Sequence, residues 1–167
     1  MKVAELTTGH SVEEVRRIVE PLRKMGKTLV TTNGCFDLLH IGHVTYLRDA
    51  ALLGDILVVG INSDRSVVQL KGPSRPICNE RDRAGVISSL KAVDYAFVFD
   101  EPDPCDFLAV LRPDVHVKGG DYTSGELPET KVVERFGGRV AIVPFTEGYS
   151  TTRLIAAIRT ISTDMKE

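Results

Sequence analysis

Two histidines three residues apart carry the clearest chemical signal in this chain. His40 and His43 end the segment 31–43, which follows a short β-branched run and precedes apolar residues at helical spacing. Residues three apart share a helix face, and the first turn of a helix offers unpaired N–H groups and a partial positive charge. Gly42, between them, leaves room for a ligand to approach the backbone. The segment predicts a cradle for the phosphates of a nucleoside triphosphate. The structural alternative is that one histidine caps the helix and the other is an unrelated surface residue.

A run of three hydroxyl side chains could also hold phosphate. Ser150, Thr151 and Thr152 precede an expected helix over residues 153–159, so Ser150 is an apt N-cap whose neighbouring free amides could bind an anion. Capping explains one hydroxyl. Three in succession after Gly148 exceed what a cap needs and favour a phosphate contact.

Several cations lie at or near the ends of expected strands. Lys71 is a compact charge on a flexible stem, and Arg75 is a planar fork that can grip phosphate at two oxygens. These two and Lys118 could each be a solvated surface charge instead. For Arg83, in a helix that begins near residue 79, an i to i+3 pair with Glu80 is an adequate explanation.

Other polar residues carry weaker signals. Asp37 and Asp94 could order turns, and we expect His10 and His116, which lack a supporting motif, to be structural or exposed. Cys35 lies inside the cradle segment, where a small buried cysteine is a commoner role than a nucleophile. The cysteines are odd in number, far apart and without metal-ligand spacing, so we expect reduced thiols and no protein metal site. They are Cys35, Cys78 and Cys105.

The composition is that of an ordinary globular domain. The 167 residues are 26% charged and 43% hydrophobic, with a formal net charge of −2 and no long basic run. This balance argues against nucleic-acid binding. The N-terminus lacks an apolar signal core, and Gly54 and Asp55 interrupt the longest apolar region. We therefore expect a cytoplasmic protein with no membrane span.

Strand and helix patterns alternate along the chain. A capping-box pattern at residues 11–14 predicts an N-terminal helix that ends before Gly26 and is kinked or shortened at Pro21. Near-continuous apolar runs then predict five buried strands at 27–32, 55–61, 95–99, 114–117 and 139–143. Such alternation predicts an α/β fold, a doubly wound, Rossmann-like five-stranded parallel sheet with helices on both faces and ligands at the strands' carboxyl ends.

The expected organisation is a single domain. Residues 1–26 are expected to form a helical extension packed on the same domain, residues 27–160 the domain itself and residues 161–167 a frayed tail.

The motifs together resemble the cytidylyltransferase-like nucleotidyltransferases that share the His-x-Gly-His signature. The resemblance covers residues 27–159 and is closest to bacterial D-glycero-β-D-manno-heptose 1-phosphate adenylyltransferase, either free-standing or as the second domain of a bifunctional kinase/adenylyltransferase. The matching segments are 33–43, 59–64, 70–76, 92–94, 117–122 and 147–152. Two departures from the cytidylyl branch favour adenylyl transfer: Phe145 stands where that branch has Arg, and Gly120 stands where it has Asp.

The resemblance implies an enzyme that joins ATP to heptose 1-phosphate and releases pyrophosphate, with Mg²⁺ on the triphosphate and no dedicated protein metal site. It also implies small-molecule partners and a homodimer. Charge stabilisation is expected from His40, His43 and Lys71. The expected nucleotide contacts are Thr32, Asn33, Gly34, Cys35, Phe36, Gly42, Lys118, Gly120, Asp121, Thr146, Ser150, Thr151 and Thr152. Contacts to the sugar phosphate are expected from Asp37, Asn62, Asp64 and Arg75.

Three alternatives stay open. A cytidylyl- or guanylyltransferase could act on glycerol 3-phosphate or a different heptose phosphate. Class I aminoacyl-tRNA synthetases share the sequence motif of residues 40–43, but they need a second, lysine-rich signature loop and a longer chain. A non-catalytic nucleotide-binding module on the same fold is the third.

Overall fold

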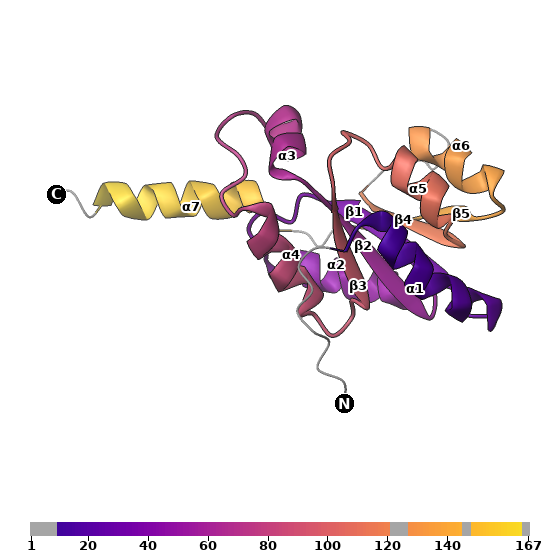
Figure 1. Ribbon diagram of the computed structural model, residues 1–167. Helices are drawn as coiled ribbons and strands as arrows, with labels where there is room; N and C mark the ends of the chain where they lie inside the picture. The colour runs from indigo at the N-terminus through magenta and orange to yellow at the C-terminus, as the bar shows by residue number, and fades with distance from the viewer. Residues whose placement is uncertain (1–9, 121–126, 145–147, 165–167) are drawn as a thin grey trace.

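The computed structural model describes residues 10–120, 127–144 and 148–164. In this part of the chain five parallel strands form one sheet in the order β3-β2-β1-β4-β5 (Figure 1). The strands are β1 (Leu29–Gly34), β2 (Ile56–Asn62), β3 (Tyr95–Phe99), β4 (Val115–Gly119) and β5 (Arg139–Val143). The helices are α1 (Val12–Lys24), α2 (Ile41–Ala51), α3 (Asp64–Lys71), α4 (Glu80–Ser88), α5 (Cys105–Leu111), α6 (Pro128–Arg135) and α7 (Thr151–Asp164).

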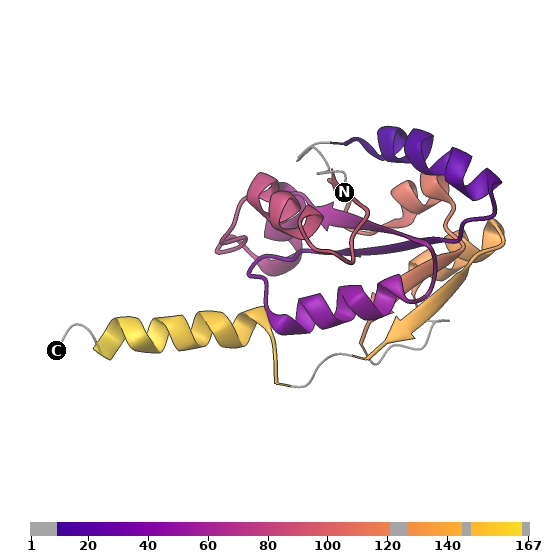
Figure 2. The same ribbon diagram turned by 90° about the horizontal axis from the view of Figure 1, so that it is seen from below.

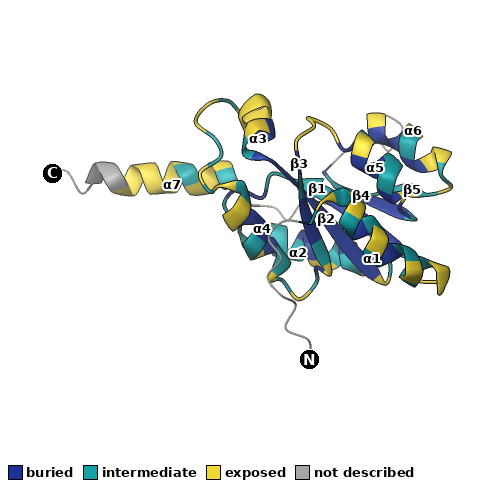
Figure 3. Ribbon diagram, viewed as in Figure 1, coloured by how far each residue is buried: buried dark blue, intermediate teal, exposed yellow. Residues whose placement is uncertain are grey.

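Helices cover both faces of the sheet, so the predicted fold class is confirmed. Figure 2 shows α2 on one face and α1 on the other. Alternate residues of each strand feed two separate cores, as the twofold repeat of a strand requires. In β2, Leu57 and Val59 face α2 and α4, whereas Ile56 and Val58 face α1, α5 and α6. The central strands are buried almost throughout (Figure 3).

The chain reverses its direction of travel across the sheet between β1 and β4. Helix α2 leads from β1 to β2 on one face, while α5 leads from β3 to β4 on the other. The two strands pair from Val30–Val115 to Thr32–Val117, and that pairing stops before their carboxyl ends. Such a switch point opens a crevice where doubly wound sheets bind their ligands.

The N-terminal helix forms as its capping signal predicts but ends later than Pro21 suggests. Ser11 accepts a hydrogen bond from the Glu14 amide, and the Glu14 carboxylate accepts one from the Ser11 amide, which completes the capping box. The helix continues through Pro21 and ends at Lys24, before Gly26 as predicted; Pro21 does not shorten it, and the kink stays a prediction. Val15 and Val19 pack against the sheet in the same core as Ile56 and Val58.

The last helix is longer than the sequence pattern indicates. α7 begins at Thr151 and continues through the expected domain boundary at residue 160 to Asp164. It projects away from the rest of the domain (Figures 1 and 2). Within the described residues, no helix is long and apolar enough to cross a membrane.

Candidate active site

The two signature histidines stand together at the start of α2. His40 is the N-cap residue in an extended conformation, and its ring stacks on that of His43 with 3.8 Å between the ring centroids. The edge of Phe36 packs against His43 at a centroid distance of 5.4 Å. The Nδ1 atoms of both histidines are buried without a hydrogen-bond partner in the described part of the chain. The His40 imidazole does not cap the helix, so two unused imidazole nitrogens and the amides of Ile41 and Gly42 remain for a ligand.

The surroundings keep both imidazoles uncharged at neutral pH. Burial, and then the neighbouring His40, lower the pKa of His43 to about 4. Burial also lowers the pKa of His40. A neutral imidazole still donates one hydrogen bond, and a bound anion would favour the protonated form of either ring. The pair is therefore poised to respond to phosphate charge.

Two glycines beside the histidine pair leave little space for a Cβ atom. A Cβ atom at Gly42 would lie 3.0 Å from the His40 Nδ1 atom and 3.2 Å from the Tyr149 Cβ atom. A Cβ atom at Gly34 would meet the ring of Phe36 at 3.0 Å. Phe36 itself adopts the left-handed backbone conformation, with φ 47°. This turn folds the ring back over Gly34 and towards His43.

Asp37 organises the loop that carries Arg75. Its carboxylate is almost fully buried and accepts hydrogen bonds from the amides of Ile77 and Cys78, at 2.8 and 2.9 Å. It also forms an ion pair with Arg75. Burial raises the pKa of Asp37, but the hydrogen bonds from Cys78, Arg75 and Ile77 outweigh it, so the net pKa is lowered. The structure thus commits Asp37 to holding the loop, and its predicted contact with sugar phosphate stays a prediction.

Arg83 corrects the sequence interpretation. It forms no pair with Glu80, whose carboxylate instead accepts a hydrogen bond from the Asp64 amide at 2.8 Å. The Arg83 side chain is wholly buried and donates to the Cys35 carbonyl, the Cys78 carbonyl and the Asp64 carboxylate. It therefore fastens the cradle segment to the loop and to the start of α3. No local pattern in the sequence indicates that role.

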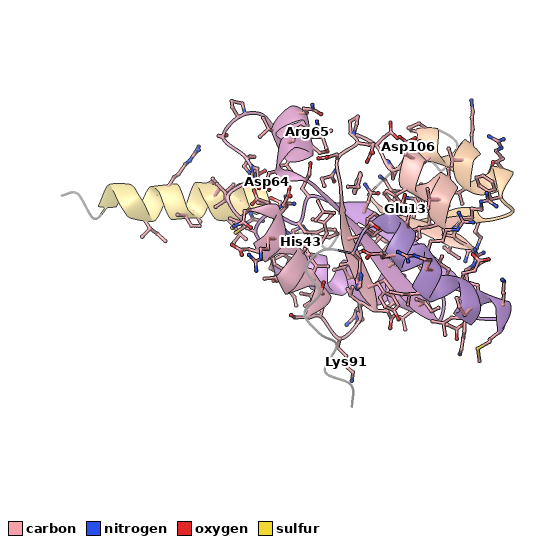
Figure 4. The ribbon with its side chains drawn as sticks, in the orientation of Figure 1. Glu13, His43, Asp64, Arg65, Lys91 and Asp106 are labelled. Atoms are coloured by element: carbon pink, nitrogen blue, oxygen red, sulfur yellow. The ribbon has the colours of Figure 1, made fainter. Side chains whose placement is uncertain are left out.

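The loop after α3 and the first turns of α7 line an open hollow of about 260 Å³. Lys71, Arg75 and Thr152 line it, which brings together predicted residues from two distant segments. Ser150 caps α7 by accepting a hydrogen bond from the Arg153 amide at 3.2 Å, and the Thr151 hydroxyl donates to the Leu38 carbonyl at 3.4 Å. Figure 4 shows His43 and Asp64 toward the same end of the domain as α7, with Glu13 and Asp106 at the other end.

Several predicted contacts have internal hydrogen-bond partners. The Thr32 hydroxyl is fully buried, 2.6 Å from the Tyr46 hydroxyl and donating to the Val117 carbonyl. Asn62 is buried and donates to Ser66 at 2.9 Å. Thr32 is fully buried in a strand paired on both sides, so its predicted contact with the nucleotide stays a prediction.

Two further predicted residues lie together at the crevice between β1 and β4. The ammonium of Lys118 donates to the side-chain oxygen of Asn33 at 3.2 Å and forms an ion pair with Glu129 at 2.8 Å. Glu129 has no sequence signal and was missed. His116, below this group in β4, is fully buried, with its Nδ1 atom 2.9 Å from the Thr31 hydroxyl. Burial, then nearby Lys118, lower its pKa to about 3, which fits a structural role.

The remaining predictions concern Gly120, two residues outside the described part of the chain, the thiols and the metal ligands. Gly120 adopts a positive φ of 128°, and its amide donates to the Val143 carbonyl at 3.1 Å; Asp121 and Thr146 lie outside the described residues. The thiols are free, and burial raises the pKa of Cys35, so it is a poor nucleophile. Among the described residues, no three His, Cys, Asp or Glu side chains gather as metal ligands.

The comparisons with known proteins agree with this geometry. A cytidylyltransferase-like family model matches residues 31–157. The bifunctional protein HldE of Syntrophotalea carbinolica is 51% identical over 146 residues, 87% of this chain and 30% of that protein. HldE of Gluconobacter oxydans is 49% identical over 148 residues, 89% of this chain and 31% of that protein. The crystal structure of a lipopolysaccharide core biosynthesis protein from Thermoplasma volcanium is 34% identical with a TM-score of 0.61, covering 75% of this chain and 100% of that one.

The chain belongs to the cytidylyltransferase-like family. It is a nucleotidyltransferase, and the histidine pair at the switch point of its sheet is the expected place for that chemistry. The chain spans about 30% of the length of the curated relatives, so the similarity does not assign their complete activities to this chain.

Proposed function

We propose that this protein transfers AMP from ATP to D-glycero-β-D-manno-heptose 1-phosphate, giving ADP-heptose and pyrophosphate for lipopolysaccharide core synthesis in the cytoplasm. The observation that carries the proposal is the stacked pair His40–His43, whose buried Nδ1 atoms have no partner in the described structure. The likeness to HldE proteins and to a lipopolysaccharide core biosynthesis protein supports the choice of pathway.

The reaction needs no protein nucleophile. An oxygen of the sugar phosphate attacks the α-phosphorus in line, the bond from that phosphorus to the bridging oxygen breaks, and pyrophosphate leaves. Catalysis then consists of alignment and of stabilising negative charge as it develops. His40 and His43 would donate to the α-phosphate, while Lys71 would approach the reacting phosphates from the loop side of the hollow.

Mg²⁺ would enter with the triphosphate and neutralise part of its charge. Because Mg²⁺ keeps several waters and binds substrate phosphates, it does not require an all-protein cage, and the described residues offer none. The turn at Ser150 and Thr151 would hold the outer phosphates at the start of α7.

A substrate matrix tests the proposal. Purified protein is given ATP, CTP or GTP with either heptose 1-phosphate or glycerol 3-phosphate, and pyrophosphate release is measured. The highest kcat/KM is expected for ATP with heptose 1-phosphate. Faster turnover of CTP with glycerol 3-phosphate would assign the chain to the cytidylyl branch, and nucleotide binding without pyrophosphate release would make it a binding module.

We also propose a homodimer in which a second copy covers α7. Leu154, Ile158 and Ile161 recur along one side of this helix and are 37%, 58% and 61% exposed. An isolated helix of 14 residues is only marginally stable in water, so α7 needs a partner that covers its apolar side. A membrane-binding helix needs a strongly basic polar face, and the two arginines of α7 do not supply one. Sedimentation equilibrium should give twice the mass of the 18.3 kDa chain, and Ile158→Asp should give monomers. A monomeric wild-type protein would refute this.

A further inference from the structure

Burying the charged carboxylate of Glu129 costs free energy, and this carboxylate has no part in the mechanism above. It belongs to the first turn of α6, where only 3% of its side chain is exposed, and it pairs with Lys118, whose side chain is 20% exposed. Removing two charges from water costs free energy that their attraction often fails to return, so a buried pair is weak support for stability. Its position, next to the crevice between β1 and β4, indicates another purpose.

Lys118 fixes the orientation of Asn33. An ammonium group has only donors, so the atom of Asn33 that it contacts at 3.2 Å must be the amide oxygen. The Asn33 Nδ2 atom must then point elsewhere, and it has no protein acceptor among the described residues. Strand pairing ends at Thr32–Val117, so Asn33 and Lys118 lie one residue further along each strand, where the crevice opens.

We propose that Glu129 is a positioning residue for nucleotide binding: it holds Lys118 against the amide oxygen of Asn33, so that the Asn33 Nδ2–H groups face the crevice and donate to an acceptor oxygen of the nucleotide. This inference rests on the proposed function, since it takes the ligand to be a nucleoside triphosphate.

The test measures ATP binding and thermal unfolding separately. Asn33→Ala removes the donor and should weaken ATP binding ~10-fold, the scale of one hydrogen bond to a charged or tightly held group. Glu129→Gln and Lys118→Met should each weaken ATP binding. The double variant should bind ATP as tightly as whichever single variant binds it less well, because both residues act through Asn33. Lys27→Met is the matched control: its ion pair with Asp55, at 3.0 Å, lies at the amino ends of the strands, so ATP binding should not change.

Analogues identify the acceptor oxygen. If it is a ribose hydroxyl, the loss caused by Asn33→Ala disappears with the deoxy-ATP that lacks that hydroxyl; if it is a phosphate oxygen, the loss is the same for ATP, 2′-deoxy-ATP and 3′-deoxy-ATP. Either result supports the proposal. Should Glu129→Gln lower the melting temperature yet bind ATP as the wild type does, Glu129 is structural only and the proposal is wrong. Binding that behaves as expected without transfer to heptose 1-phosphate would overturn the proposed function and leave this inference intact.

Discussion

Gly42→Ala should separate the stability of the protein from its activity. Gly42 is the second residue of α2, and its backbone requires no left-handed conformation. Alanine is favoured over glycine in a helix interior by up to ~1 kcal/mol, so the variant should be as stable as the wild type or slightly more stable. The new Cβ atom would lie 3.0 Å and 3.1 Å from the Nδ1 and Cε1 atoms of His40. These contacts are tighter than van der Waals packing allows, so the imidazole must move by a few tenths of an ångström.

That displacement removes one preorganised donor and narrows the approach to the backbone. Because small misplacements of catalytic groups are costly, we expect kcat to fall at least ~10-fold and as much as ~100-fold. Pyrophosphate release gives kcat and KM, and thermal unfolding gives stability. Ala51→Gly, at the far end of α2, is the control with the opposite pattern: it removes a methyl group that packs against the core, so stability should fall while kcat is unchanged. Wild-type turnover in Gly42→Ala would refute the view that His40 and the space beside it serve catalysis.

Three further outcomes are expected. ATP binding between about pH 4 and 6.5 should take up a proton, because the pKa of His43 is lowered to about 4 in the free protein and rises beside phosphate; calorimetry in two buffers measures this, and His43→Asn should reduce the uptake to the part that belongs to His40. Ser150→Ala and Thr151→Ala should each raise the KM for ATP, and Ser150→Ala should also lower stability by the ~1 kcal/mol of a lost cap; an unchanged KM would make Ser150 a cap only and Thr151 only a donor to the Leu38 carbonyl. Asp37→Asn should lower the free energy of unfolding by about 2 kcal/mol. Because the Asp37 pKa is lowered, this stabilisation is complete above the ordinary carboxyl pKa of about 4 and fades as the pH falls through the lowered value. Equal acid sensitivity of both proteins would contradict that assignment.

Local patterns were enough to predict the fold. Near-continuous apolar runs mark buried parallel strands, and the capping box at Ser11 marks the start of α1. Strand ends were less exact. Asn33, Asn62 and Lys118 were expected after their strands and lie inside them, because pairing with neighbouring strands extends each one. Pro21 did not stop α1, because packing of Val15 and Val19 outweighs the local cost.

The site was predictable where one short segment supplies it. His40, Gly42 and His43 share a helix turn, so their spacing alone implied their proximity. The supporting residues are a different matter. Arg83 and Glu129 act on groups 48 and 11 residues away in the chain, and no periodicity reports such contacts. The roles of Arg83 and Glu129 depend on Cys35 and Lys118, partners that only the tertiary fold brings into contact with them.

The most direct test of the histidine pair is a comparison of wild-type protein with His43→Ala, each supplied with MgATP and D-glycero-β-D-manno-heptose 1-phosphate. The wild type should release pyrophosphate in equal amount to the ADP-heptose formed, and His43→Ala, folded and equally stable, should do so ~100-fold more slowly or worse. An undiminished rate in a folded His43→Ala protein would contradict the assignment of the pair to charge stabilisation at the α-phosphate.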